Sequence, residues 1–215
     1  MKREDKNNRT KNLKPQETDV LRDPIAAYGK RPLGPYTVKD YYAIPEDRRV
    51  ELIDGYIYDL ASASKVHQRI LLAIATQIQS CIESLRKECE VYVAPSDVQL
   101  DKDIYTMVQP DVFVVCGDDD PKEHAHQGAP ELIAEILSPS GRMHDKVRKL
   151  MKYRNAGVRE YWIVDPEKRE VLVYLFAEGD EPELFTFEDI IPIRISEGHC
   201  KVDFAKISSL AARFY

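Results

Sequence analysis

Hydrophobic and polar residues are patterned differently in the two parts of the chain. Residues 1–34 show no periodicity, so we predict a flexible N-terminal leader there, followed by one domain over residues 35–215. Within that domain, apolar residues recur at helical spacing over 64–88, which predicts a core helix of about five turns or more. The apolar positions of this helix are Ile70, Leu71, Ile74, Ile78, Ile82 and Leu85.

Short apolar runs bounded by turn residues predict β-strands on both sides of this helix. A short helix is expected from Thr37, and then two strands joined at Asp54-Gly55, a dipeptide that favours hairpin turns. A basic helix over 141–156 is expected to end at Gly157, because glycine suits the left-handed position after a helix. Short strands and a terminal helix are expected at the end of the chain. Further strands are predicted over 89–101, 107–115, 130–138, 158–166 and 169–176.

Two of the predicted strands each contain an acid among apolar neighbours. Asp111 lies in MVQPDVFVV (107–115), and Glu135 lies in PELIAEILS (130–138). A buried carboxylate is costly unless it is paired, and two facing carboxylates repel each other or share a proton. A divalent cation between them satisfies both, because such ions prefer oxygen ligands. A strand end, a helix cap or an arginine partner is the structural alternative for each acid alone, but two acids followed by a basic helix favour a metal site.

The distribution of charge adds a second feature to this region. The chain has a formal net charge of -6, which argues against a protein that coats polyanions without discrimination. Residues 142–159 nevertheless hold seven Lys and Arg residues against a single acid, Asp145. A basic run is usually a solvated helix face, but its position directly after the two acids favours a surface for nucleic acid.

Composition also indicates the cellular compartment and the oxidation state of the cysteines. No apolar run approaches the roughly 18 residues of a membrane span, and the N-terminus is too polar for a signal peptide, so we expect a cytoplasmic protein without membrane contact. The cysteines are far apart in the sequence and form no CxxC pair. We therefore expect reduced, mostly buried thiols rather than a disulfide framework or a zinc ribbon. The four residues are Cys81, Cys89, Cys116 and Cys200.

An ordered set of longer phrases resembles the Uma-type restriction endonuclease family, within the PD-(D/E)XK nuclease superfamily. The phrases are RRVELIDGYIYDLASASKVHQRI, QPDVFVV and GAPELIAEILSPSGRMHDKVRKLMKYRNAGVREYWIVDP, in that order. The resemblance covers nearly all of the chain except the leader. It implies an α/β fold with a restriction-endonuclease-like core, in which a mixed β-sheet is flanked by helices. It also implies an endonuclease that depends on Mg²⁺ or Mn²⁺ and has DNA as its partner.

The resemblance assigns roles to individual residues. Glu51 of VELIDG matches the family's first acid, Asp111 its proline-aspartate acid, and Glu135 the acid of its third strand. Asp111 and Glu135 would be the principal metal ligands, with the carbonyl of Ile136 beside them. Glu51 would bind the metal directly or through water. His67 matches a position that the family usually fills with histidine, so a contact with substrate is a candidate role beside a hydrogen bond at the helix entry.

The lysine of the superfamily is displaced in this chain. It is expected two residues after the glutamate, where the chain has Leu137, so the positive charge must come from the following helix. The Uma-type pattern places a lysine there, and Lys149 shares one helical stripe with Tyr153. Lys146 is the rival, because it lies nearer the edge of the apolar face of the helix. We expect Lys149 to be catalytic, and Arg142 and Lys146 to bind the substrate at the mouth of the cleft.

Three functions are open from the sequence. The intact acids and Lys149 favour a metal-dependent endodeoxyribonuclease, and a homodimer is the expected assembly because cutting both strands of a duplex suits two-fold symmetry. The displaced lysine and the acidic total charge suit a nuclease-fold nucleic-acid-binding or interaction module with little or no catalysis. A metal hydrolase that acts on a smaller phosphoester has no specific feature in its favour.

Overall fold

The computed structural model describes most of the predicted domain. Residues 1–31, which make up most of the predicted leader, lie outside the described residues. For residues 143–147 and for residue 211, the description covers the backbone alone. Pro32–Tyr215 forms one compact unit. The described ranges are 32–85, 88–101, 103–117, 124–138, 143–179 and 181–211.

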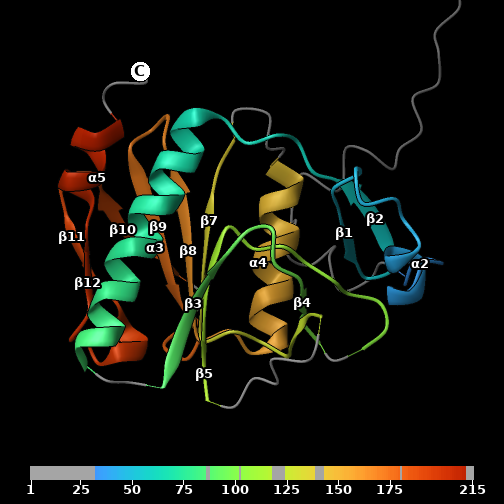
Figure 1. Cartoon of the computed structure of the whole chain (residues 1–215). Coiled ribbons are helices and arrows are strands. Elements are labelled where there is room, and N and C mark those ends of the chain that lie inside the picture. The colour runs from blue at the N-terminus through green and yellow to red at the C-terminus, as the bar shows by residue number, and fades with distance from the viewer. Residues whose placement is uncertain are drawn as a thin grey trace, which may run out of the picture. The chain divides into compact units, whose positions relative to one another are not determined.

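A mixed six-stranded sheet lies at the centre of this unit (Figure 1). Its strands in spatial order are β10 (Glu183–Thr186), β9 (Glu170–Leu175), β8 (Glu160–Asp165), β7 (Leu132–Ile136), β5 (Val112–Cys116) and β3 (Cys89–Val93). Neighbouring strands are antiparallel except β7 and β8, which run parallel and are connected through helix α4 (Met143–Ala156). This architecture confirms the predicted α/β class, in which a mixed sheet is flanked by helices.

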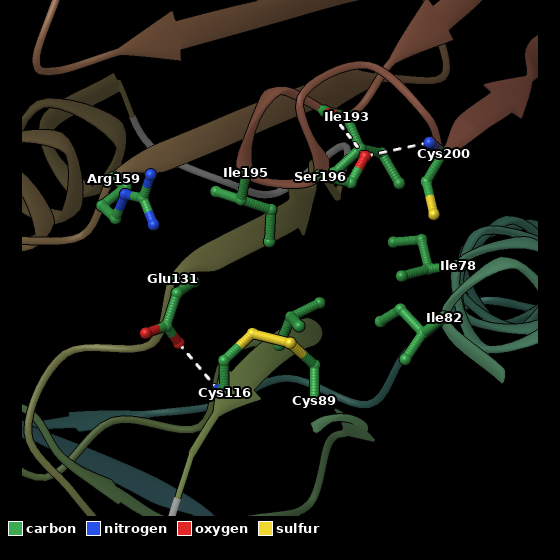
Figure 2. Close-up of a pocket in the computed structure, with 11 residues that line it drawn as sticks. Ile78, Ile82, Cys89, Cys116, Glu131, Arg159, Ile193, Ile195, Ser196 and Cys200 are labelled. Carbon is green, nitrogen blue, oxygen red and sulfur yellow. Dashed lines mark hydrogen bonds between the residues drawn. A yellow bond between two sulfur atoms is a disulfide. The ribbon is translucent and has the colours of Figure 1, made fainter. Parts of the chain in front are cut away.

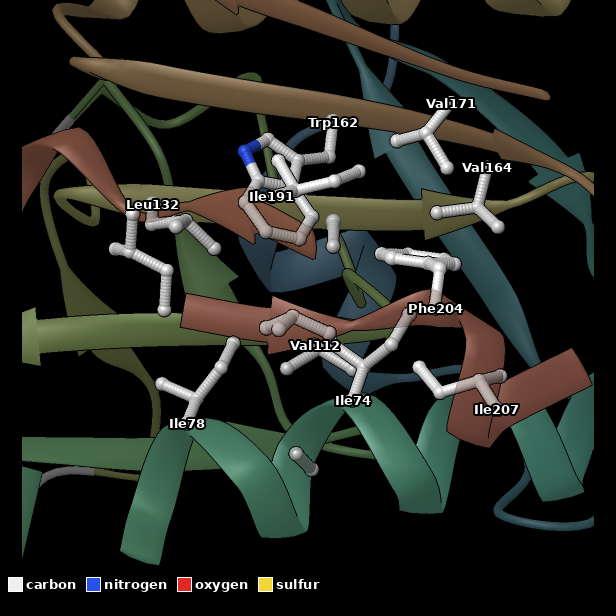
Figure 3. Packing of buried hydrophobic residues seen from close by; sticks show 14 of the residues in the cluster. Ile74, Ile78, Val112, Leu132, Trp162, Val164, Val171, Ile191, Phe204 and Ile207 are labelled. Atoms are coloured by element: carbon white, nitrogen blue, oxygen red, sulfur yellow. The ribbon is translucent and has the colours of Figure 1, made fainter. Parts of the chain in front are cut away.

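The helices cover the two faces of the sheet, because successive side chains of a strand point to opposite sides. Val112 of β5 belongs to the core beneath α3 (Lys65–Leu85) and α5 (Phe204–Ala211), which Figure 3 shows at close range. Phe113, the next residue, packs with Tyr153 of α4 on the other face. The predicted core helix is therefore confirmed as α3. None of the helices in the described part of the chain has both the length and the apolarity that a bilayer crossing requires.

Smaller elements surround this sheet. One antiparallel hairpin lies outside the main sheet, next to a short helix (Figure 1). The hairpin consists of β1 (Val50–Ile53) and β2 (Tyr56–Asp59), and the short helix is α2 (Val38–Tyr42). Strands β11 (Ile190–Pro192) and β12 (Lys201–Asp203) form an antiparallel pair, and β4 (Val98–Gln99) and β6 (His126–Gln127) form a parallel pair. A 3₁₀ helix, η1 (Arg194–Ser196), lies between β11 and β12 in the sequence.

The β1–β2 hairpin turns at Asp54-Gly55, as the sequence predicts. Both residues have left-handed backbone angles, φ 50 and φ 77. Glycine is required at the second position, because a Cβ atom at Gly55 would overlap the carbonyl of Gly34. A backbone bridge between Leu52 and Met107 joins the hairpin to the segment before β5. The hairpin is thereby fixed beside the start of β5.

Two predicted strands are shorter than their apolar runs. The run after α3 divides into β3 and β4, because Pro95 has no N–H group to donate to a strand ladder. The run that contains Asp111 pairs in the main sheet only from Val112 onward. Met107 and Val108 instead form isolated bridges with β1 and β4. Asp111 therefore lies just before β5 and not inside it.

The expectation of reduced thiols is wrong, because all four cysteines are paired in disulfides. Cys89 lies opposite Cys116 in the β3–β5 register, with Cα atoms 4.0 Å apart. Cys81 of α3 is bonded to Cys200, just before β12, with Cα atoms 5.6 Å apart. Partners are separated by 27 and 119 residues in the sequence. Their pairing follows from strand register and helix packing, which the spacing of cysteines does not reveal.

Removing the Cys81–Cys200 disulfide should destabilise the fold, because it cross-links positions 119 residues apart and so restricts the unfolded chain. We expect the variant Cys81→Ser/Cys200→Ser to lose about 2–4 kcal/mol of unfolding free energy. Guanidinium titration without reductant measures this loss. Adding reductant should then destabilise the wild type more than the variant. Four alkylatable thiols in native protein purified without reductant would contradict the pairing.

Candidate active site

Asp111 and Glu135 lie opposite each other on the α4 face of the sheet. Val112 pairs with Ala134 in the antiparallel β5–β7 register, so the next step along both strands sets Asp111 opposite Glu135. The N–H of Ile136 donates to Asp111 Oδ2 at 2.8 Å and fixes that carboxylate at the end of β7. The two acidic side chains are 16% and 12% exposed, respectively. The carboxylates of Asp111 and Glu135 are therefore neighbours with little exposure to water.

Glu51 approaches the same place from the hairpin. It lies on β1, is 2% exposed, and accepts a hydrogen bond at Oε1 from the N–H of Gln109 at 3.0 Å. The side chain of Gln109 is itself held by hydrogen bonds to Tyr41 and Asp97. Gln109 precedes Asp111 by two residues. The backbone bridge between β1 and this segment thus brings the first acid beside the proline-aspartate pair.

The ammonium group of Lys149 joins two of the three acids. Lys149 Nζ lies 2.8 Å from Glu51 Oε1 and 3.0 Å from Glu135 Oε1. Tyr153, one turn further along α4, donates its hydroxyl proton to the same oxygen of Glu135 at 2.7 Å. The helical stripe expected from the sequence therefore points at the acids. The side chain of Lys146, the rival lysine, lies outside the described residues.

His67 borders the site from the first turn of α3. Its backbone N–H donates to Ser64 Oγ at 3.1 Å, while its ring Nε2 lies 3.1 Å from Asp111 Oδ2. Its Nδ1 atom is buried and has no hydrogen-bond partner among the described residues. Burial disfavours the charged ring, but the hydrogen bond and charge of Asp111, with the charge of Glu135, outweigh burial and raise the pKa of His67. The helix-entry hydrogen bond and a contact with the acids are therefore both present, and a contact with substrate stays a prediction.

Burial and crowded charge shift the pKa of Glu135 upward, to about 7. Burial has the largest effect, Lys149 opposes it, and the carboxylates of Asp111 and Glu51 add to it. Burial also disfavours the ammonium of Lys149, yet the charges of Glu135 and Glu51 outweigh that cost and raise the pKa of Lys149. Lys149 is consequently charged at neutral pH, whereas Glu135 is near its midpoint.

The donor chemistry of the site fits a divalent cation, although the acids do not form a finished metal site. Across the described ranges, no three Asp, Glu, His or Cys side chains converge closely enough to hold an ion. The ammonium of Lys149 contacts Glu51 and Glu135 instead. Asp111 and Glu135 offer the hard oxygen donors that Mg²⁺ and Mn²⁺ prefer. Burial is the main cause of the raised pKa of Glu135, and the carboxylates of Asp111 and Glu51 add to it, so a cation bound beside these acids would favour the charged form of Glu135.

Sequence reasoning assigned no role to Gln109 or Tyr153. The spacing of four residues between Tyr153 and Lys149 was the available signal for the tyrosine. Gln109 acts through its backbone N–H, which no side-chain pattern reveals. The carbonyl of Ile136, a predicted metal ligand, belongs to the residue whose N–H holds the neighbouring aspartate. Arg142 lies outside the described residues, so its contact with substrate stays a prediction.

A cavity of about 230 Å³ lies on the opposite face of the sheet, beneath α3 (Figure 2). Glu131 on its wall accepts a hydrogen bond from the N–H of Cys116 at 2.9 Å. Because Val114 of β5 points into this cavity, the sheet separates it from the acids on the α4 face. The cavity is therefore no part of the acid site. Its other lining residues are Ile78, Ile82, Cys89, Arg159, Ile193, Ile195, Ser196 and Cys200.

Known proteins resemble this chain in sequence and in fold. A family model described as "Uma2: Putative restriction endonuclease" matches residues 38–195. An uncharacterized protein from Synechocystis sp. is 29% identical over 126 residues, which cover 58% of this chain and 64% of that protein. The match thus spans less than two thirds of the relative's own length.

A solved structure has a similar fold. It is described as a putative nuclease belonging to DUF820 from Anabaena variabilis. The two structures superpose with a TM-score of 0.70 at 20% sequence identity, over 82% of this chain and 99% of the other. At this identity, the likeness shows a shared fold.

The stability of the protein should depend on pH through Glu135. A carboxyl whose pKa is raised on folding contributes stability that is fully present below its unfolded pKa, near 4.5, and is lost as pH rises through about 7. In chelator, we expect the unfolding free energy of the wild type to fall over this range relative to Glu135→Gln. The expected size is about 1.4 kcal/mol per unit of pKa shift. Denaturant titrations at several pH values measure the difference, and a difference independent of pH would refute the raised pKa.

Proposed function

The chain belongs to the Uma2 family of putative restriction endonucleases, and from this premise we propose that it is a metal-dependent endonuclease that hydrolyses phosphodiester bonds of DNA. One observation carries the proposal. The ammonium of Lys149 lies within hydrogen-bond distance of both Glu51 and Glu135, and Asp111 lies opposite Glu135 in the register of β5 and β7. Metal-assisted hydrolysis of an anionic phosphodiester uses oxygen ligands for a cation, and a fixed positive charge stabilises the charge that builds up in the reaction.

The acids would hold the cation. Asp111 and Glu135 are the proposed ligands for Mg²⁺ or Mn²⁺, with the carbonyl of Ile136 as a further donor. Glu51 would bind directly or through water. When bound, the ion supplies Lewis acidity that polarises the phosphate and lowers the pKa of the attacking water. The raised pKa of Glu135 agrees with this assignment, because the neighbouring carboxylates of Asp111 and Glu51 contribute to it and a cation would offset their charge.

Lys149 would act as a positive charge rather than as a proton acceptor. Its pKa is raised, so it stays protonated at neutral pH. A fixed ammonium beside the acids can stabilise the charge that builds on the phosphate oxygens and can orient the attacking water. Tyr153 keeps Glu135 in place by donating to its carboxylate, and the N–H of Gln109 does the same for Glu51.

The basic helix and His67 would form the substrate side of the site. Arg142 and Lys146 are proposed to contact backbone phosphates, and His67 to supply a donor near the acids. Arg148 lies over the ring of Tyr58, 4.2 Å from its centroid, which links α4 to the hairpin. Cleavage of both DNA strands would be carried out by two copies of the chain in a two-fold homodimer.

Titration of Mg²⁺ and Mn²⁺ into purified protein with plasmid and single-stranded DNA tests this function. We expect nicking or linearisation of the plasmid only with added cation, and its loss with a chelator, because the acids alone supply no Lewis acid. An Asp111→Asn protein purified in parallel controls for contaminating nuclease and should leave the plasmid intact. DNA that is bound but uncut across the whole titration would favour the nuclease-fold binding module instead.

Lys149→Ala should remove most of the cleavage, whereas the acids should still bind the metal, because the charge of the bound ion offsets the loss of the ammonium. We expect cleavage to fall by about two orders of magnitude, as for the loss of one positioned charge. Lys146→Ala, on the same helix, is the matched control and should have a much smaller effect. Rates are measured with purified variants in Mn²⁺, and metal affinity by calorimetry. The reverse order would assign the role to Lys146, and no effect of either change would remove both lysines from the mechanism.

A further inference from the structure

Lys152 forms a further link between α4 and the hairpin that contains Glu51. The residue is 8% exposed, and its ammonium is paired with the carboxylates of both Asp54 and Asp101. Asp54 lies in the turn of the hairpin, and Asp101 lies just after β4. One buried cation therefore holds three separate parts of the chain together.

The two lysines of α4 and their two acidic partners in the hairpin have the same spacing in the sequence. Lys149 and Lys152 are three residues apart on α4, which places them on one side of the helix. Their partners Glu51 and Asp54 are also three residues apart. Strand residues at this separation point to opposite faces, but the left-handed backbone at Asp54, φ 50, turns its carboxylate back toward the helix. The hairpin consequently docks on α4 through two successive lysine contacts.

The pairs around Lys152 are shielded from water. The side chains of Asp54 and Asp101 are 29% and 22% exposed, and that of Lys152 is 9% exposed. Burial disfavours its ammonium, but the hydrogen bonds and charges of Asp101 and Asp54 outweigh burial and raise the pKa of Lys152. The ammonium of Lys152 is therefore charged at neutral pH. Removing the cation would leave Asp54 and Asp101 without their shared partner, so the hairpin turn would lose its ion pair to α4.

The placement of Glu51 relative to Glu135 depends on contacts of this kind. Among the described residues, the β1–β2 hairpin forms its own sheet and shares no strand pairing with the six-stranded sheet that contains Glu135. On one side, the hairpin is held by the bridge between Leu52 and Met107. On the side of α4, it is held by the ion pairs with the two lysines and by the contact of Arg148 with the ring of Tyr58.

We propose that Lys152 is a positioning residue that holds the hairpin against α4, so that the ammonium of Lys149 stays shared between Glu51 and Glu135. The effect on cleavage rests on the proposed nuclease function, whereas the docking of the hairpin does not. Lys152 acts through Asp54 and touches neither glutamate. Loss of the link moves Glu51 relative to the other acids, and displacements of about 1 Å are enough to slow catalysis strongly.

Lys152→Met and Asp54→Asn test this role, with Asp59→Asn as the matched control. Asparagine tolerates the left-handed backbone of Asp54, and Asp59 forms an exposed ion pair with Arg48 on the same hairpin. We expect kcat for plasmid cleavage to fall about tenfold or more in the first two variants, with KM changed by less than about twofold. Amide hydrogen exchange over residues 50–59 should become faster in these two variants and stay unchanged in Asp59→Asn.

Each result decides a separate point. Unchanged exchange in Lys152→Met would overturn the link, whether or not the protein cleaves DNA. Faster exchange with unchanged kcat, or a rise in KM alone, would overturn the positioning role. Wild-type protein that never cleaves DNA would refute the proposed nuclease, and the exchange measurement would still decide whether Lys152 holds the hairpin. If Lys152→Met fails to fold, Asp54→Asn serves for both measurements, because it keeps the pair between Lys152 and Asp101.

Discussion

The ammonium group of Lys149 is the constraint on which the site depends. It is largely shielded from water, charged, and shared by Glu51 and Glu135, which come from different sheets. Leaving one partner of a buried ion pair without the other costs about 3–5 kcal/mol. This cost keeps the hairpin, β7 and α4 at the distances at which the ammonium contacts both carboxylates. The parallel connection from β7 through α4 to β8 places the helix over the sheet face toward which Glu135 points. The topology of the sheet therefore determines that the lysine of α4 and the acid of β7 meet at the site.

The sequence alone predicted those residues of the candidate site that belong to a local residue pattern. An acid in an apolar run is conspicuous, which is how Asp111 and Glu135 were found, and the register of β5 and β7 sets them opposite each other. Helical spacing pointed to Lys149, whose ammonium contacts two of the acids. The mixed sheet flanked by helices was also predicted and is confirmed. These features depend on periods of two and of about 3.6 residues, which a sequence displays directly.

Other contacts depend on how distant elements pack, and the sequence does not display them. Gln109 holds Glu51 through a backbone N–H, a group that every residue except proline has, so the residue type gives no signal for this contact. The partners of Lys152 come from a hairpin turn and from a loop after β4. The pairing of the cysteines follows from the register of β3 on β5 and from the packing of α3. A single proline, Pro95, divides what the apolar pattern presents as one strand.

The disulfide between Cys89 and Cys116 has a consequence for how the sheet can associate with other chains. In the described sheet, β3 is an outer strand, paired with β5 on one side only. Outer strands expose backbone groups that can recruit a strand from another molecule, and an outer strand that detaches can be exchanged between two copies of a protein. The covalent bond across β3 and β5 prevents such detachment at this edge. The sheet can therefore be extended beyond β3, but β3 itself cannot be replaced by the same strand of a second copy while the disulfide is intact.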